Sequence, residues 1–268
     1  MPDGLEVEEG VLAGGIPYLA IGNGEPLVML RGAMPLNENP TGLTRWAELR
    51  SLKPFAQHFR VFAVGHAPNL RAGSTMSDIA APYSRAFEDR FGRPVRVGGW
   101  STGGSIALQL AIDCPHLVER LVLGASACRL GPEGKRVQLR YLTLLEAGQR
   151  RQAAQSTTPL FVKSQLAQTL VGWLMWLMAP LEGPIDVEHM SVVMRAEDAF
   201  DAERDLHRVK APTLVVAAED DKVYPLDVAR LTADRIPDSR LIMYEGKGHT
   251  QVLEDRRLVG DVVQFLLR

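Results

Sequence analysis

The stretch Gly99-Trp100-Ser101-Thr102-Gly103 decides the fold of this chain. It follows the apolar run Val95-Arg96-Val97, and residues 104–111 after it have the composition of a helix. A strand that turns sharply into a helix pushes the central residue out of the sheet. Glycines are needed on both sides of that residue because a Cβ there would collide with the neighbouring chain. We therefore expect Ser101 to be exposed beside the backbone N–H groups of a helix start, as a nucleophile is presented.

Short apolar runs bounded by turn residues recur along the chain and predict strands, and amphipathic stretches of helical length lie between several of them. This alternation indicates an α/β fold in which a mostly parallel central sheet has helices on both faces. The expected strands are residues 16–21, 26–30, 60–64, 95–98, 120–124, 213–217 and 240–244, and the expected helices are residues 43–59, 77–91, 103–113, 225–236 and 251–267.

The alternation is interrupted once, between the fifth and sixth of these strands. Residues 129–207 have a helical pattern with breaks at Pro159, Pro180 and Pro184, and they contain no convincing strand. We predict a core domain made of residues 1–128 and 208–268, into which residues 129–207 are inserted as a helical cap. Such a cap would lie over the carboxyl ends of the strands, where open α/β sheets bind ligands.

Residues suited to activate a serine follow two of the expected strands. A serine hydroxyl is a poor nucleophile at neutral pH, so it needs an imidazole to accept its proton and a carboxylate to orient that imidazole. His249 follows the last expected strand, and Asp220 and Asp221 follow the strand before it. All three elements are expected at the carboxyl ends of parallel strands, in the chain order Ser, Asp, His. The pattern predicts a catalytic triad of Ser101, His249 and one of the two aspartates.

In these motifs the chain resembles the α/β-hydrolase superfamily over nearly its whole length, from about Gly15 to Leu267. The resemblance implies an α/β-hydrolase fold with a helical cap. It rests on Gly-x-Ser-x-Gly-Gly at residues 99–104, on the strand and loop of residues 212–221, and on Gly246-Lys247-Gly248-His249.

The resemblance also implies which aspartate is the acid. In this superfamily the acid usually stands three residues after a small residue that ends the strand. Ala218 occupies the place of the small residue, which implies Asp221 rather than Asp220.

An oxyanion hole of two backbone N–H groups is a further implication of the resemblance. One N–H belongs to Thr102, and the other belongs to the loop after residues 26–30. The superfamily commonly carries His-Gly in that loop, whereas this chain has Arg31-Gly32-Ala33. The N–H of Ala33 is therefore expected as the second donor. Arg31 either orients the loop or faces the substrate.

The expected cap contains an apolar segment at residues 170–179. It is well short of the ~20 residues that a membrane span requires, so we interpret it as a buried or pocket-lining helix. Trp173 and Trp176 of this segment, together with Trp100 beside the serine, are the expected substrate-binding residues. Among the histidines without a catalytic role, we interpret His66 as structural or solvent-facing.

Together these features predict a serine hydrolase that cleaves an ester or related acyl bond through an acyl-enzyme. The Leu, Met and Trp residues of the cap favour a small, largely apolar substrate. The same triad could also serve C–C bond hydrolysis, lactone opening, acyl transfer or perhydrolysis. A ligand-binding protein of this fold with little turnover is an alternative from another class.

Composition excludes several other classes. The 268 residues carry a formal net charge of −2, which gives no sign of a nucleic-acid surface. Cys114 and Cys128 cannot build a disulfide framework, and no cluster with metal-ligand spacing or nucleotide fingerprint is present, so we predict no cofactor and no metal. Residues 1–6 lack the apolar core of a secretory signal, which favours a cytoplasmic protein. The expected partner is a small acyl compound, without stable membrane insertion, and the oligomeric state is open.

Overall fold

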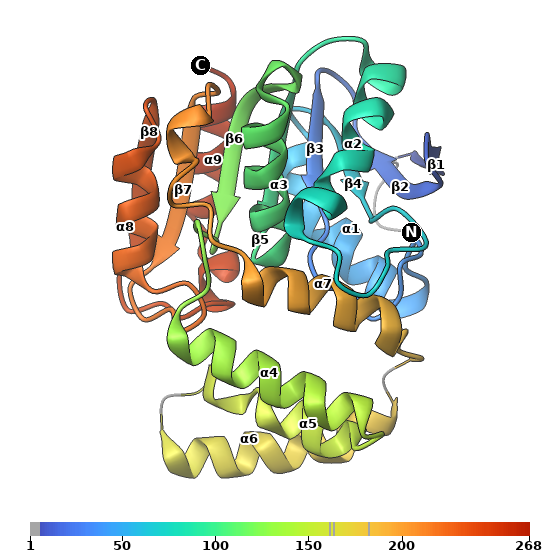
Figure 1. Ribbon diagram of the computed structural model, residues 1–268, viewed down its shortest axis with the longest axis vertical. Coiled ribbons are helices and arrows are strands. Elements are labelled where there is room, and N and C mark those ends of the chain that lie inside the picture. Colours follow the sequence, from blue (N-terminus) through green and yellow to red (C-terminus); the bar gives the residue numbers. More distant parts are fainter. Residues whose placement is uncertain (1–5, 161, 163, 182) are drawn as a thin grey trace.

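An eight-stranded sheet runs through the centre of the computed structural model, which describes residues 6–160, 162, 164–181 and 183–268 (Figure 1). Its strand order is β1-β2-β4-β3-β5-β6-β7-β8. The five pairings from β4 to β8 along this order are parallel, and β2 pairs antiparallel with both β1 and β4. Residues 1–5, on which the expectation about a secretory signal rests, and residues 161, 163 and 182 of the expected cap lie outside the described residues.

Every expected strand is present, and the sheet gains one strand that the sequence did not predict. This strand, β1, is VEEGVL in sequence, and its two glutamates and one glycine hide the alternation of apolar and polar residues. The strands are β1 (Val7–Leu12), β2 (Ile16–Ile21), β3 (Pro26–Leu30), β4 (Arg60–Val64), β5 (Val95–Trp100), β6 (Val118–Gly124), β7 (Thr213–Ala218) and β8 (Ser239–Tyr244).

Helices cover both faces of the sheet, as expected. The helix expected over residues 251–267 begins late, because a short 3₁₀ turn at Gln251–Glu254 is followed by Asp255, whose Oδ1 accepts the backbone N–H of Arg257. This local bond favours a turn over a continuous helix. The helices on the two faces are α1 (Gly42–Ala56), α2 (Met76–Phe91), α3 (Thr102–Asp113), α8 (Leu226–Arg235) and α9 (Leu258–Leu266).

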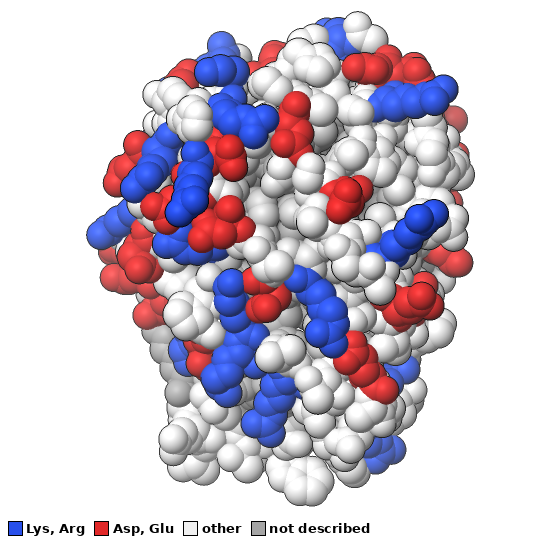
Figure 2. Space-filling view, in the orientation of Figure 1, with Lys and Arg blue, Asp and Glu red and all other residues white. Residues whose placement is uncertain are grey.

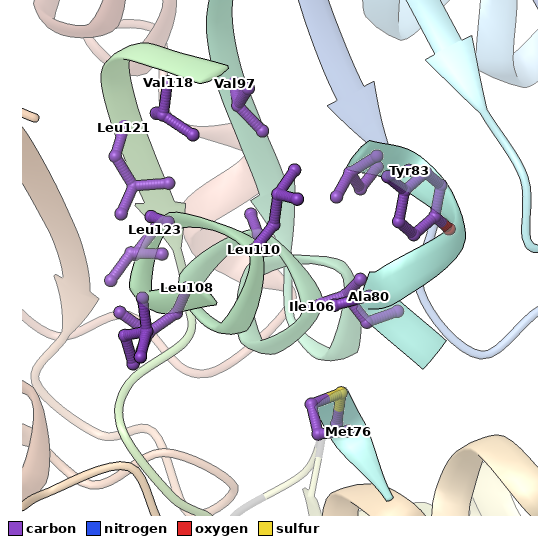
Figure 3. Packing of buried hydrophobic residues seen from close by; sticks show 14 of the residues in the cluster. Met76, Ala80, Tyr83, Val97, Ile106, Leu108, Leu110, Val118, Leu121 and Leu123 are labelled. Carbon is purple, nitrogen blue, oxygen red and sulfur yellow. The ribbon is translucent and has the colours of Figure 1, made fainter. Parts of the chain in front are cut away.

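Two apolar clusters, one on each face, hold the helices to the sheet. One cluster joins the sheet to α2, α3 and α8, and the other joins it to α1 and α9. Figure 3 shows Ile106, Leu108 and Leu110 of α3 packed among side chains of β5, β6 and α2. The helix that follows Ser101 is therefore fixed from several sides, and this gives the serine a rigid support.

Four helices between β6 and β7 lie together at the end of the molecule toward which the parallel strands point (Figure 1). The two ends of this region meet in a short bridge between Arg129 and Asp201. The division into a core domain and a cap of residues 129–207 remains a prediction. The four helices are α4 (Pro132–Glu146), α5 (Arg150–Ser156), α6 (Gln165–Met178) and α7 (Val187–Ala199).

Of the two forms expected for the apolar segment, a buried or a pocket-lining helix, burial is wrong for most Leu and Trp residues of α6, and pocket lining stays a prediction. Gly172 is the one buried residue of α6 in the described chain, and its missing side chain lets Gln155 and Thr158 approach the helix. The opposite face turns outward, and Figure 2 shows few charges at this end of the molecule. Within the described residues, no helix combines the length and apolarity needed to cross a membrane. The exposed apolar side chains of α6 are Leu166, Leu170, Trp173, Leu174, Leu177 and Met178.

Candidate active site

Ser101 stands on a strained turn between β5 and α3. Its backbone has φ 53° and ψ −127°, a conformation that L-residues with a side chain rarely adopt. A Cβ on Gly99 would lie 2.2 Å from the carbonyl of Gly103, and a Cβ on Gly103 would lie 2.1 Å from the carbonyl oxygen of Leu30. The two glycines of the motif are thus required by the close approach of backbone on either side of the serine.

His249 joins Ser101 to Asp221. Its Nε2 lies 3.0 Å from Ser101 Oγ, and its Nδ1 lies 2.8 Å from Asp221 Oδ2. An ionised carboxylate only accepts hydrogen bonds, so Nδ1 carries the proton and Nε2 is free to accept the proton of the serine. The three side chains form a continuous relay from the hydroxyl to the carboxylate.

Two loops hold the ends of this relay together. The loop after β7 carries Asp221, which is buried, and its second oxygen accepts the backbone N–H groups of Val223 and Tyr224 at 2.7 and 3.0 Å. The neighbouring Asp220 donates its own N–H to the carbonyl of Lys247, in the loop that carries His249. Of the two adjacent aspartates, Asp221 is the one whose carboxylate contacts the imidazole.

The loop after β3 packs against the start of α3. A Cβ on Gly32 would lie 3.3 Å from the backbone nitrogen of Gly103 and 3.4 Å from the Cβ of Thr102. Ala33 follows directly and is partly buried against the core. The two residues whose N–H groups are expected to form the oxyanion hole therefore belong to backbone segments in contact with each other.

Arg31 does not face the strained serine but points toward α1. Its Nε and one terminal nitrogen donate to the two carboxylate oxygens of Glu48 at 2.7 and 2.9 Å, and another nitrogen donates to Asn39 at 3.1 Å. The guanidinium is buried, and such a charge requires a carboxylate partner. This geometry favours the first of its two expected roles, orientation of the loop.

A pair of buried histidines holds the same loop from the other side. Because the carbonyl of Arg31 can only accept, His66 donates to it from Nε2 at 3.0 Å. The Nδ1 of His66 then accepts from Nε2 of His189 in α7, at 2.9 Å. Burial lowers the pKa of His66 to about 4. The interpretation of His66 as structural agrees with this environment, whereas its link to α7 had no signal in the sequence.

Sequence reasoning also missed a buried carboxyl group beside the serine. Glu197 of α7 is 2% exposed, and its oxygens accept from Thr102 Oγ1 at 3.0 Å and from the Tyr224 hydroxyl at 2.5 Å. Burial raises the pKa of Glu197, against the hydrogen bonds from Tyr224 and Thr102, which lower it. One signal was available, since Glu197 follows Val193 and Ala196 at the spacing of the buried face of α7.

The three tryptophans that are expected to bind substrate lie in two separate places. Trp100 packs on Gly124 and lines a cavity of about 520 Å³ with Trp46 and Leu253. Trp173 and Trp176 are in α6, where their rings make an edge contact and the Arg151 guanidinium lies 4.3 Å from the Trp176 ring centre. Substrate binding by these three residues remains a prediction. In the part of the chain that the structure describes, no three His, Cys, Asp or Glu side chains are grouped to hold a metal ion.

Comparison with known proteins gives matches over most of the chain. The model of the alpha/beta hydrolase family matches residues 27–262. The chain is 24% identical over 240 residues to pimeloyl-(acyl-carrier protein) methyl ester esterase of Nitrosomonas europaea, covering 87% of this chain and 91% of that protein. It is 28% identical to 2-hydroxy-6-oxo-2,4-heptadienoate hydrolase of Pseudomonas putida, covering 97% and 96%. The crystal structure of the enol-lactonase from Burkholderia xenovorans has a similar fold, with a TM-score of 0.73 at 18% identity, covering 97% and 100%.

Proposed function

Because this chain belongs to the alpha/beta hydrolase family, we propose that it is a serine hydrolase that cleaves an ester or related acyl bond. The observation that carries this proposal is the relay of Ser101, His249 and Asp221, with distances of 3.0 and 2.8 Å between successive side chains. The similarity to a methyl ester esterase supports an ester among the acyl compounds.

In the proposed reaction Ser101 Oγ attacks the acyl carbon while its proton passes to His249 Nε2. Asp221 keeps the imidazole in the required tautomer and stabilises the imidazolium that forms. The negative charge that develops on the acyl oxygen is held by the N–H groups of Thr102 and Ala33. The bond between the acyl carbon and the leaving group then breaks as His249 donates its proton to the leaving group. An acyl-enzyme on Ser101 remains.

Water completes the proposed cycle. His249 accepts a proton from water as the water oxygen attacks the acyl carbon, and the bond to Ser101 Oγ breaks. The proton then returns to the serine, and the acid product leaves. The same two backbone donors hold the oxyanion in this second half, since the charge appears at the same oxygen.

The substrate is proposed only as a small acyl compound. An apolar substrate was expected from the Leu, Met and Trp residues of the cap, but most of those in α6 face outward and so do not support it. A panel of p-nitrophenyl esters of increasing acyl length, beside a panel of lactones, would define the acyl group.

The proposal is tested by Ser101→Ala. We expect the variant to lose ester hydrolysis by at least about 10³-fold in kcat, as removal of a triad nucleophile does, while its thermal unfolding stays nearly unchanged. A fluorophosphonate probe should label the wild type and not the variant. A wild type that neither hydrolyses esters nor reacts with the probe would refute the proposed function.

Hydrolysis of a carbon–carbon bond is the second candidate. The similarity to a 2-hydroxy-6-oxo-2,4-heptadienoate hydrolase extends over 97% of this chain, and the compound in the name of that enzyme is a keto acid without an ester group. The same relay would serve either reaction. Turnover of such a keto acid at a higher kcat/KM than any ester of the panel would favour this candidate.

A further inference from the structure

Glu197 is a buried carboxyl group for which the proposed mechanism has no role so far. It lies in α7, close to the end of the helix, and it is 2% exposed. Among the described residues no Lys or Arg forms an ion pair with it; hydroxyl groups donate to both of its oxygens, and the Gln138 side chain is a further hydrogen-bonding neighbour. Burial of a carboxyl group without a basic partner is costly, so a purely structural contact would be made at lower cost by an apolar side chain.

The two hydroxyl groups that contact Glu197 both belong to residues next to the relay. Thr102 directly follows Ser101, and its hydroxyl donates to one carboxylate oxygen. Tyr224 donates to the other oxygen, its backbone N–H donates to Asp221, and its ring lies nearly parallel to that of His249 with centres 6.1 Å apart. Glu197 therefore bridges the residue after the nucleophile and the loop that carries the acid.

A further bond fixes Tyr224 against α3. Its hydroxyl lies 2.8 Å from Ser105 Oγ, one turn after Thr102. Tyr224 therefore keeps a polar partner even when the carboxyl group of Glu197 is removed. Thr102 has no second partner of this kind among the described side-chain hydrogen bonds, so removal of the Glu197 carboxyl group leaves its hydroxyl held by packing alone.

We propose that Glu197 is a positioning residue of the active site, which holds the Thr102 side chain and thereby aims the Thr102 N–H at the developing oxyanion. This inference rests on the proposed hydrolase function. Rotation of the Thr102 backbone would carry its hydroxyl away from the carboxyl group, so the bond resists displacement of the adjacent N–H. The direction of the Thr102 N–H affects the energy of the transition state more than the binding of the substrate, because the charge on the acyl oxygen develops only during the reaction.

The test compares four variants of the full chain with p-nitrophenyl acetate as the substrate. Glu197→Leu removes the acceptor, and Thr102→Val removes the donor at nearly constant volume. We expect each to lower kcat by about 10- to 100-fold with little change in KM, since small misplacement of a catalytic group costs about this much. Glu197→Gln should recover most of the kcat, because its amide oxygen still accepts from Thr102. Glu188→Leu, the same type of replacement at an exposed position of α7, should match the wild type.

The double variant Glu197→Leu/Thr102→Val gives the decisive comparison. If the two side chains act through one bond, its kcat should be no lower than that of either single variant. Multiplied losses, an unchanged kcat in Thr102→Val, or a Glu197→Gln variant as slow as Glu197→Leu would each overturn the inference. Should Glu197→Leu fail to fold, the Thr102→Val and Glu197→Gln results still decide.

Failure of the inference is distinguishable from failure of the proposed function. A wild type without Ser101-dependent turnover or probe labelling refutes the proposed function and, with it, the role of Glu197. A wild type that is active, combined with a Glu197→Leu variant of normal kcat, refutes only the role of Glu197.

Discussion

At the residue scale, the backbone of Ser101 combines chemistry with strain. Its φ of 53° and ψ of −127° suit a glycine better than any residue with a Cβ. We therefore expect Ser101→Gly to have a free energy of unfolding higher than that of Ser101→Ala by about 1 kcal/mol. Urea denaturation of the two inactive variants measures this difference. Equal stability would mean that the turn carries no strain at this position.

Replacement by asparagine should affect kcat very differently at the two adjacent aspartates. Asp221→Asn is expected to lower kcat by about 10⁴-fold, because the amide no longer selects the productive tautomer of His249. Its oxygen can still accept the N–H groups of Val223 and Tyr224, so the fold should persist. Asp220→Asn should stay close to the wild type. Steady-state kinetics on one ester compare the variants, and a comparable loss in Asp220→Asn would contradict this assignment.

The residues that the sequence revealed are those in local motifs. Ser101 and His249 lie in short glycine-bearing stretches after strands, and Asp221 lies at a fixed distance from the end of one. Glu197 and His189 are different, because neither lies in a motif that indicates a site, and their contacts with Thr102 and His66 arise only when the chain folds. The spacing of Glu197 from preceding apolar residues indicates a buried helix face but identifies no partner.

At the element scale, α7 is bonded to the rest of the molecule near both of its ends. His189, close to its start, contacts His66 after β4, and Glu197, close to its end, contacts Thr102 at the start of α3. The backbone N–H of Asp186 also donates to the carbonyl of Pro35, at 2.7 Å. The helix is thus connected to the two loops from which the oxyanion donors are expected.

The histidine pair predicts a loss of stability in acid. Burial lowers the pKa of His66 from 6.5 to about 4, so between these values the unfolded chain binds more protons than the folded one. Stability is therefore complete above pH 6.5 and falls as the pH decreases toward 4, by about 2 kcal/mol between pH 7 and 5. The groups that face His66 are His189, Arg31 and, through His189, Asp186.

Urea denaturation at pH 7, 6 and 5 measures the free energy of unfolding and so tests this predicted loss of stability in acid. His66→Gln should remove the part of the pH dependence that His66 contributes, because glutamine does not titrate; the part from His189, whose pKa burial also lowers, should remain. A variant whose stability falls as steeply as that of the wild type would show that other groups are responsible.

Element boundaries were predictable where apolar periodicity was strong. The parallel strands β3, β4 and β7 are nearly all buried and appear as apolar runs, whereas β1 pairs only with β2 and contains Glu8, Glu9 and Gly10. The outward face of α6 could not be predicted, because residues 170–178 are apolar or glycine throughout and no polar face marks the exposed side. The side that is covered depended on Gly172 and the approach of α5.

At the scale of the whole molecule, burial is distributed unevenly. All six residues of β7 are buried, whereas most of α6 is exposed on its outer side. We expect backbone amides of α6 to exchange with deuterium at least about 100-fold faster than those of β7, because local opening of α6 exposes little buried surface. Hydrogen exchange followed by mass spectrometry measures the exchange rates of α6 and β7 in one experiment. Equal protection of the two elements would contradict this ordering.

The contacts near both ends of α7 have a consequence for how substrates reach Ser101 and how products leave it. Because α7 is held near both of its ends, it cannot rotate about one end as a rigid body. It therefore forms part of the fixed framework around Ser101. Reactants and products must therefore pass it without displacing it, and we expect any widening of their route at α6, where Gly172 is the one buried residue in the described part of the helix.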